Sequence, residues 1–148
     1  HPMKGFDFFV DVMKDLLQYK KINIIVVGHD PSKSRLKKLE KINNSSIIRY
    51  SSKNEDLASL LPYVDLVLTT SLYGESFPNL GLDAQLFECK FVTSDVGDSH
   101  LLTIDDWVFE PNDEYGCVKS ILSALDSGFR AKVNSDYSPK AFKCKFYK

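Results

Sequence analysis

The stretch "DLVLTTSLYGESFPNLGLDA" (65–84) combines three local patterns. It opens with an apolar run, passes through a loop containing Gly74, and continues from Pro78 into a run with helical character. Short apolar runs bounded by polar residues are typical of strands buried in a parallel sheet. Proline suits the first turn of a helix, where its missing N–H costs no hydrogen bond. The stretch therefore predicts a strand, a loop and a helix in succession.

The same alternation of strand and helix continues on both sides of this stretch. Strands are expected at 22–28, 46–50, 65–71, 90–95 and 107–110. Helices are expected at 5–20, 30–42, about 54–62, after Pro78, and at 112–127. Strands that alternate with helices predict an α/β fold, here a Rossmann-like doubly wound parallel sheet. The 148 residues have the size of a single domain, so we treat 1–148 as one unit.

One strand of such a fold is missing from the pattern. The first strand of a doubly wound sheet is usually central, in the order 3-2-1-4-5-6. This chain instead begins with a loop that leads into a helix. We therefore expect the first strand to be formed by residues upstream of His1. At the other end, 137–148 is expected to form a basic, aromatic helix.

The composition excludes several classes of protein. With 43% hydrophobic residues, 26% charged residues and a net charge of -1, the chain lacks the basic excess of nucleic-acid-binding domains. No apolar run approaches the roughly 18–20 residues of a membrane span, and no signal peptide is evident. Cys89, Cys117 and Cys144 are widely spaced, and the histidines have no metal-ligand spacing. These features predict reduced core thiols, no metal site and a cytoplasmic location.

The loop after 65–71 is the main candidate for a ligand site, because ligands of open α/β sheets bind beyond the carboxyl ends of the strands. The amides of Asn79 and Leu80 at the helix start, with the helix dipole, suit a phosphate. Glu75 and Asp83 flank that position, and carboxylates accept strong hydrogen bonds from sugar hydroxyls. A ligand with hydroxyls on both sides of a diphosphate is a nucleotide-sugar. On spacing alone, two ordinary surface acids remain an alternative.

The segment "GESFPNLGLDA" (74–84) resembles the E-x7-E segment of the family-4 retaining glycosyltransferases. That segment usually reads E-G/S-F-P-N, three small or apolar residues, then E-A. The likeness covers nearly all of residues 4–126 in the right order, through "KGFDFFVDVMKDL", "INIIVVG", "LASLLPYVDLVLTTS", "KFVTSDVGDS" and "FEPND". The resemblance implies a GT-B architecture of two Rossmann-like halves, with this chain as the C-terminal, donor-binding half. It also implies that helix 137–148 packs on the N-terminal half, which this chain lacks.

The resemblance assigns roles to individual residues. It implies that Glu75 and Lys4 are catalytic: Glu75 holds donor-sugar hydroxyls, and Lys4 neutralises the diphosphate, on which charge grows as it leaves. The other implied contacts are the donor sugar for Ser76, Phe77 and Pro78, the diphosphate for Asn79 and Leu80, the ribose for Asp83, and the nucleobase for the backbone at Tyr50 and Ser51.

Two features depart from the family pattern. Asp83 stands where the family mostly has glutamate, so ribose contact needs a small backbone shift or a bridging water. The arginine that usually accompanies the lysine lies upstream of Lys4, outside this chain. A neighbouring turn, "DVGDS" (95–99), follows the strand at 90–95 and is expected to help shape the donor pocket.

The function implied is that of the donor-binding domain of a retaining glycosyltransferase. The enzyme is expected to transfer a hexose-type sugar to a glycan or lipid-linked acceptor in bacterial polysaccharide or glycolipid synthesis. No cofactor is expected, and no obligatory metal, because the sequence contains no D-x-D. The basic residues of the C-terminal segment are either plain surface or a contact with the inner face of a membrane.

Three alternatives remain at this point. An inactive glycosyltransferase-like nucleotide-binding subunit is compatible with the shorter acid at Asp83. A GT-B sugar-nucleotide epimerase is expected to carry further acids and histidines around the cleft, which the sequence does not show. A receiver-like module needs an acidic pair at its first strand and an aspartate ending its third, whereas the strand before the candidate loop ends "LTTS".

Overall fold

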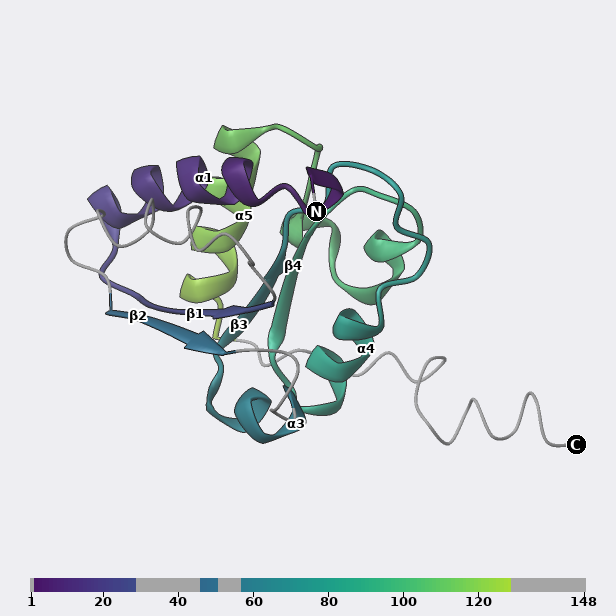
Figure 1. Cartoon of the computed structure of the whole chain (residues 1–148), viewed down its shortest axis with the longest axis horizontal. Helices are drawn as coiled ribbons and strands as arrows, with labels where there is room; N and C mark the ends of the chain where they lie inside the picture. The colour runs from purple at the N-terminus through teal and green to yellow at the C-terminus, as the bar shows by residue number, and fades with distance from the viewer. Residues whose placement is uncertain (1, 29–45, 51–56, 129–148) are drawn as a thin grey trace, which may run out of the picture.

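The computed structural model describes residues 2–28, 46–50 and 57–128 (Figure 1). The expected helices at 30–42 and 137–148, as well as Ser51 and Cys144, lie outside these residues. For 46–50 the structure describes the backbone alone.

The described strands form two parallel sheets. In the first, β1 (Asn23–Val27) pairs with β2 (Ser46–Tyr50). In the second, β4 (Lys90–Ser94) lies between β3 (Leu66–Thr69) and β5 (Val108–Phe109). Each strand falls within its predicted range, with one or both ends shortened in all but β2. The predicted α/β fold with a parallel sheet is confirmed.

No hydrogen-bonded pairing joins β1 to β3 in the described part of the chain. In the strand order 3-2-1-4-5-6 of a doubly wound sheet, strand 1 lies in the middle. Without it, a pair of strands (3-2) and a group of three strands (4-5-6) remain. The observed groups, β2-β1 and β3-β4-β5, have this arrangement.

The helices confirm most of the predicted positions and correct two boundaries. The α-helices are α1 (Phe6–Tyr19), α3 (Leu57–Leu60), α4 (Asn79–Leu86) and α5 (Glu114–Asp126). The 3-10 turns are η1 (Pro2–Lys4), η2 (Leu61–Tyr63), η3 (Ser99–Leu102) and η4 (Asp105–Trp107). The helix predicted over 54–62 is a single α-helical turn followed by η2, because Pro62 lacks an N–H and disfavours helical backbone before it.

Pro78 was predicted to occupy the first turn of α4, but it is the residue that precedes the helix. Its backbone is extended, with ψ of 111°, and Asn79 is the first helical residue. At α5 the acidic start is confirmed: the Asp113 carboxylate accepts a hydrogen bond of 2.9 Å from the Gly116 amide. That contact satisfies one of the free N–H groups at the helix start.

Both faces of the β3-β4-β5 sheet are covered by helices. Figure 1 shows α1 and α5 on one side of β3 and β4, with α4 on the other. Successive residues of β4 point to opposite faces, so Val92 packs with α1 and α5, whereas Phe91 packs with α4 and η3. Helices on two faces of a parallel sheet are the layering of a doubly wound fold.

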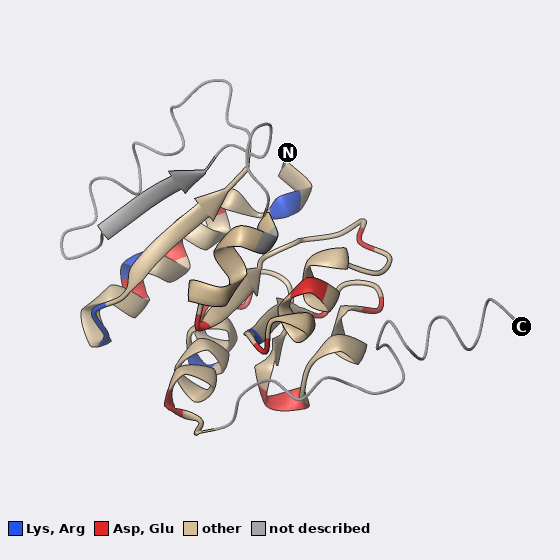
Figure 2. Ribbon diagram, turned by 90° about the horizontal axis from the view of Figure 1, so that it is seen from below, with Lys and Arg blue, Asp and Glu red and all other residues tan. Residues whose placement is uncertain are grey.

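Two buried cysteines confirm the prediction of core thiols for the described residues. Cys89 and Cys117 are free and buried. Burial raises the pKa of both thiols, and the nearby carboxylates of Asp65 and Asp113 add to the effect. None of the described helices is long and apolar enough to cross a membrane. Figure 2 shows basic and acidic residues dispersed over the described ribbon.

Candidate functional site

The N-terminal turn is fastened to the loop that follows β3. The Leu72 amide donates to the carbonyl of Met3 at 2.8 Å, and the Thr70 hydroxyl donates to the carbonyl of Lys4 at 3.0 Å. Gly5 has a φ of +61°, and a Cβ atom there would overlap the Thr70 carbonyl oxygen. Any other residue at this position would therefore clash with the Thr70 backbone. These contacts hold Lys4 beside the carboxyl end of β3.

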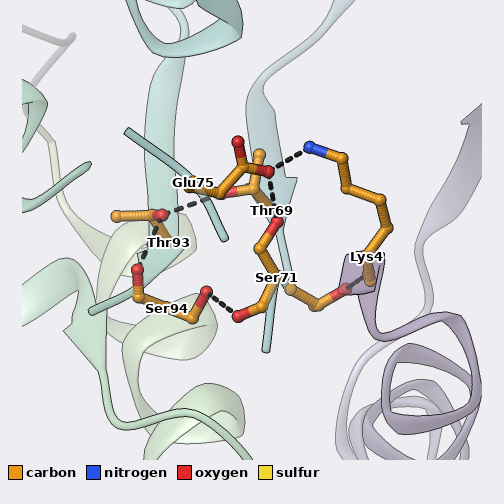
Figure 3. Close-up of polar contacts among 7 residues, drawn as sticks. Lys4, Thr69, Ser71, Glu75, Thr93 and Ser94 are labelled. Carbon is orange, nitrogen blue, oxygen red and sulfur yellow. Dashed lines mark hydrogen bonds and ion pairs between the residues drawn. The ribbon is translucent and has the colours of Figure 1, made fainter. Parts of the chain in front are cut away.

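Lys4 and Glu75 meet in this arrangement. One carboxylate oxygen of Glu75, Oε1, accepts hydrogen bonds from the Lys4 ammonium and from the Ser71 hydroxyl, the latter at 2.6 Å (Figure 3). The Lys4 side chain is 54% exposed and that of Glu75 is 17% exposed. The sequence analysis assigned these residues to separate parts of a donor, and the structure brings them into direct contact.

The contacts to Glu75 determine its charge. Partial burial raises the pKa of this carboxyl, but the hydrogen bonds from Lys4 and Ser71 and the positive charge of Lys4 outweigh burial. The pKa of Glu75 therefore lies below its ordinary value, and the side chain is ionised at neutral pH. An ionised carboxylate is a strong acceptor for hydroxyl donors.

Buried hydroxyl groups connect this loop to β4. The Ser94 hydroxyl donates to the Ser71 carbonyl at 2.6 Å, and the Ser99 hydroxyl donates to the Ser94 carbonyl at 2.7 Å. The hydroxyls of Thr69 and Thr93 share a hydrogen bond of 2.8 Å between the same two strands. The sequence analysis did not single out any of these residues. The polar ending "TTS" after an apolar strand is the signal that could have pointed to them.

The turn after β4 packs on the backbone that carries Glu75. The Asp98 amide donates to the Ser76 carbonyl at 2.7 Å, and Gly97 has a φ of +60°. The expected contribution of "DVGDS" to the pocket thus takes the form of backbone support for the loop. The glycine in that turn was the available signal for this contact.

The helix α4 begins at Asn79, four residues after Glu75. No described residue accepts a hydrogen bond from the amides of Asn79 or Leu80, as expected for the first turn of a helix. Asp83 lies one turn further along α4, on the side of Asn79, and its carboxylate forms no hydrogen bond or ion pair with a described residue. This leaves two backbone donors and one acceptor in the first two turns of α4.

The residues assigned to the donor sugar are not all open to solvent. Ser76 is exposed, whereas Phe77 is partly buried and packs with the core cluster under α4. Pro78 is half-buried at the helix start. Of the nucleobase candidates, Tyr50 ends β2, where it pairs with Val27, and Ser51 lies outside the described residues.

An open pocket of about 410 Å³ lies next to the Gly5 connection, and Gly5 and Leu72 are part of its lining. Its lining includes Asp7, Asp11 and Glu114, so its charge is unsuited to a phosphate. The described residues contain no group of three or more His, Cys, Asp or Glu that could hold a metal ion. The site next to Glu75 is therefore the better candidate for an anionic ligand.

The chain is similar to a family of known proteins. The family described as "Glycosyl transferases group 1" matches residues 1–127. No curated protein sequence matches the chain.

Several solved structures share the fold of this chain. A glycosyltransferase from Rickettsia africae aligns with a TM-score of 0.66 and 20% identity, over 91% of this chain and 38% of that one. The GtfA/B complex aligns with a TM-score of 0.68 and 17% identity, over 88% of this chain and 28% of that one. Anabaena Alr3699/HepE, in complex with UDP-glucose, aligns with a TM-score of 0.59 and 16% identity, over 98% of this chain and 46% of that one.

This chain therefore spans less than half the length of each of these structures. At these identities the likeness concerns the fold, which corresponds to one Rossmann-like half of a GT-B structure. The family match extends over most of the chain and includes the loop with Glu75 and the start of α4. The chain belongs to the group 1 glycosyl transferases.

Proposed function

We propose that this chain is the C-terminal, donor-binding domain of a retaining glycosyltransferase of the family-4 type, which transfers a hexose-type sugar from a nucleotide-sugar. The observation that carries the proposal is the contact of Lys4 with Glu75, in the loop that leads into the free amides at the start of α4. A cation in contact with a carboxylate, followed along the chain by two amide donors at a helix start, matches a ligand that joins a diphosphate to a sugar.

In the proposed complex the diphosphate lies between the Lys4 ammonium and the amides of Asn79 and Leu80. Glu75 accepts hydrogen bonds from the donor sugar, with Ser76, Phe77 and Pro78 beside it, and Asp83 accepts from the ribose. As the bond to the sugar breaks, negative charge grows on the departing phosphate. Lys4 and the helix start stabilise that charge in the transition state.

The remaining parts of the proposal concern the whole enzyme. We propose a glycan or lipid-linked acceptor held by an N-terminal domain, a cytoplasmic location at the inner face of a bacterial membrane, and a role in polysaccharide synthesis. No cofactor and no obligatory metal are proposed. Since this chain spans 28–46% of the similar structures, we expect it to bind donor and not to transfer sugar by itself.

An inactive nucleotide-binding subunit is the second candidate. Asp83 favours it, because aspartate reaches less far toward a ribose than the glutamate usual in this position. The two candidates differ in whether the sugar contributes to binding through Glu75.

The test is a thermal-shift titration of the chain with UDP, GDP, ADP and their glucose conjugates. UDP-glucose is the first probe, because it is the ligand in the Anabaena structure. A ligand present at 100 times its dissociation constant adds about 2.7 kcal/mol of stability. Glu75→Ala should abolish the preference for the conjugate, and Asp83→Ala should weaken every nucleotide.

The control is Asp106→Ala, which removes an exposed acid in η4 and should leave the shifts unchanged. The proposal is wrong if no nucleotide stabilises the folded chain. Stabilisation by nucleotides with no preference for a sugar conjugate would instead support the inactive subunit.

A further inference from the structure

The two contacts to Glu75 fall on the same oxygen. Lys4 and Ser71 both donate to Oε1, and no described residue donates a hydrogen bond to Oε2. Figure 3 shows both dashed lines on one oxygen and the other oxygen pointing away from the labelled side chains. Each oxygen of an ionised carboxylate offers about two acceptor sites. Oε1 is thus filled, and Oε2 is the atom left for a ligand hydroxyl.

The two donors differ in rigidity. The Lys4 ammonium ends a long side chain that is 54% exposed, so it is free to take other positions. Ser71 is 3% exposed, and its backbone carbonyl accepts a hydrogen bond from the buried Ser94. The Ser94 carbonyl is held in turn by the hydroxyl of Ser99. Ser71 is therefore the fixed donor and Lys4 the movable one.

A bound diphosphate makes the difference between the fixed and the movable donor larger. In the proposed function Lys4 must serve the diphosphate, and any movement toward it weakens the contact with Glu75. The Ser71 hydroxyl does not depend on Lys4, because the Ser71 backbone is anchored separately, through its carbonyl, by the Ser94 hydroxyl of β4. It keeps Oε1 in place while the lysine changes partner.

We infer that Ser71 is a positioning residue for the donor site: it holds Oε1 of Glu75 so that Oε2 faces the hydroxyls of the donor sugar. The inference rests on the proposed function and adds a residue that acts on the sugar through Glu75 alone. If the inference is right, loss of the Ser71 hydroxyl weakens the binding of sugar conjugates and leaves the affinity for the bare nucleotide unchanged.

The test compares wild type with Ser71→Ala and with Ser120→Ala. Ser120 is a buried serine on α5 whose hydroxyl donates to the Val108 carbonyl, so its loss is a matched change away from the site. Ser71→Cys serves as a second variant should Ser71→Ala fail to fold, since a thiol has similar size and is a weak donor.

The first readout is the titration of the Glu75 carboxyl by NMR in the ligand-free chain. Loss of the Ser71 hydrogen bond should raise the pKa of Glu75, and Ser120→Ala should not. An unchanged titration of Glu75 in folded Ser71→Ala would overturn the inference.

The second readout is the ratio of affinities for a nucleoside diphosphate and its glucose conjugate, for the uracil, guanine and adenine forms. Ser71→Ala should weaken the conjugate roughly tenfold, the loss expected for a hydrogen bond to a charged group, with bare nucleotide unchanged. An equal loss for both ligands would overturn the positioning role. If wild type binds none of the conjugates, the proposed function fails, and the NMR titration alone decides whether Ser71 holds the carboxylate.

Discussion

Gly97 lies against the carbonyl group of Ser76, although β4 and the helix α4 separate the two residues in sequence. The Asp98 amide donates to that carbonyl at 2.7 Å, and a Cβ atom at Gly97 would lie 2.6 Å from the same oxygen. The turn after β4 thereby supports the backbone of the loop that carries Glu75. The position of the Glu75 side chain, in the loop after β3, thus depends on Gly97 in the turn after β4.

Gly97→Ala should destabilise the chain by roughly 2–5 kcal/mol, from a left-handed backbone and overpacking together. Urea unfolding followed by circular dichroism measures the loss. Gly128→Ala is the matched control, because a Cβ atom there meets nothing within 4 Å; it should stay within about 0.5 kcal/mol of wild type. Equal stability of the two variants would contradict the close approach at Gly97.

Gly81→Ala tests the packing of α4 on the sheet. A Cβ atom at Gly81 would lie 2.6 Å from Leu102 Cδ1 and 2.8 Å from Phe91 Cε1, and both neighbours are fully buried. Overpacking costs roughly 1–3 kcal/mol, which outweighs the gain of about 1 kcal/mol from alanine in a helix. The melting temperature should therefore fall. A higher melting temperature would mean that the helix has room to shift away from Phe91.

Short apolar runs were sufficient to predict the strands, because helices cover both faces of the β3-β4-β5 sheet and each strand contains apolar residues that pack under them. The boundaries that failed lie next to prolines: Pro62 divides a predicted helix, and Pro78 precedes α4. Proline has more than one acceptable place near a helix start, so its position does not define the first helical residue.

The candidate site was only partly predictable. Glu75 and Asp83 stand out by type and by their place around a helix start, and Lys4 was assigned through a family resemblance. Ser71 and Ser94 did not stand out, because their roles arise from β3 lying beside β4. Which strands are neighbours is a property of topology, and single serines at strand ends carry no pattern that reveals it.

The pH dependence of stability should report the contacts of Glu75. Its pKa in the folded chain is below the ordinary value of 4.5, so between the two values the unfolded chain binds more protons. The associated stability is complete above about pH 4.5 and is lost as pH falls through the folded pKa. Wild type should therefore lose more stability than Glu75→Gln when urea unfolding is repeated from pH 6 to about pH 3. Parallel curves for the two proteins would show that Glu75 gains nothing from Lys4 and Ser71.

Lys4→Gln should weaken nucleoside diphosphates more than monophosphates, because Lys4 is proposed to contact the diphosphate. Loss of one charge-assisted contact predicts about tenfold weaker binding of the diphosphate, measured by isothermal titration calorimetry with the best nucleotide. Lys119→Gln removes an exposed lysine from α5 and should change neither affinity. Since Lys4 also pairs with Glu75, its loss should raise the pKa of Glu75 as well. A Lys4→Gln chain with wild-type preference for diphosphates would show that the amides of α4 suffice, and would restrict Lys4 to its contact with Glu75.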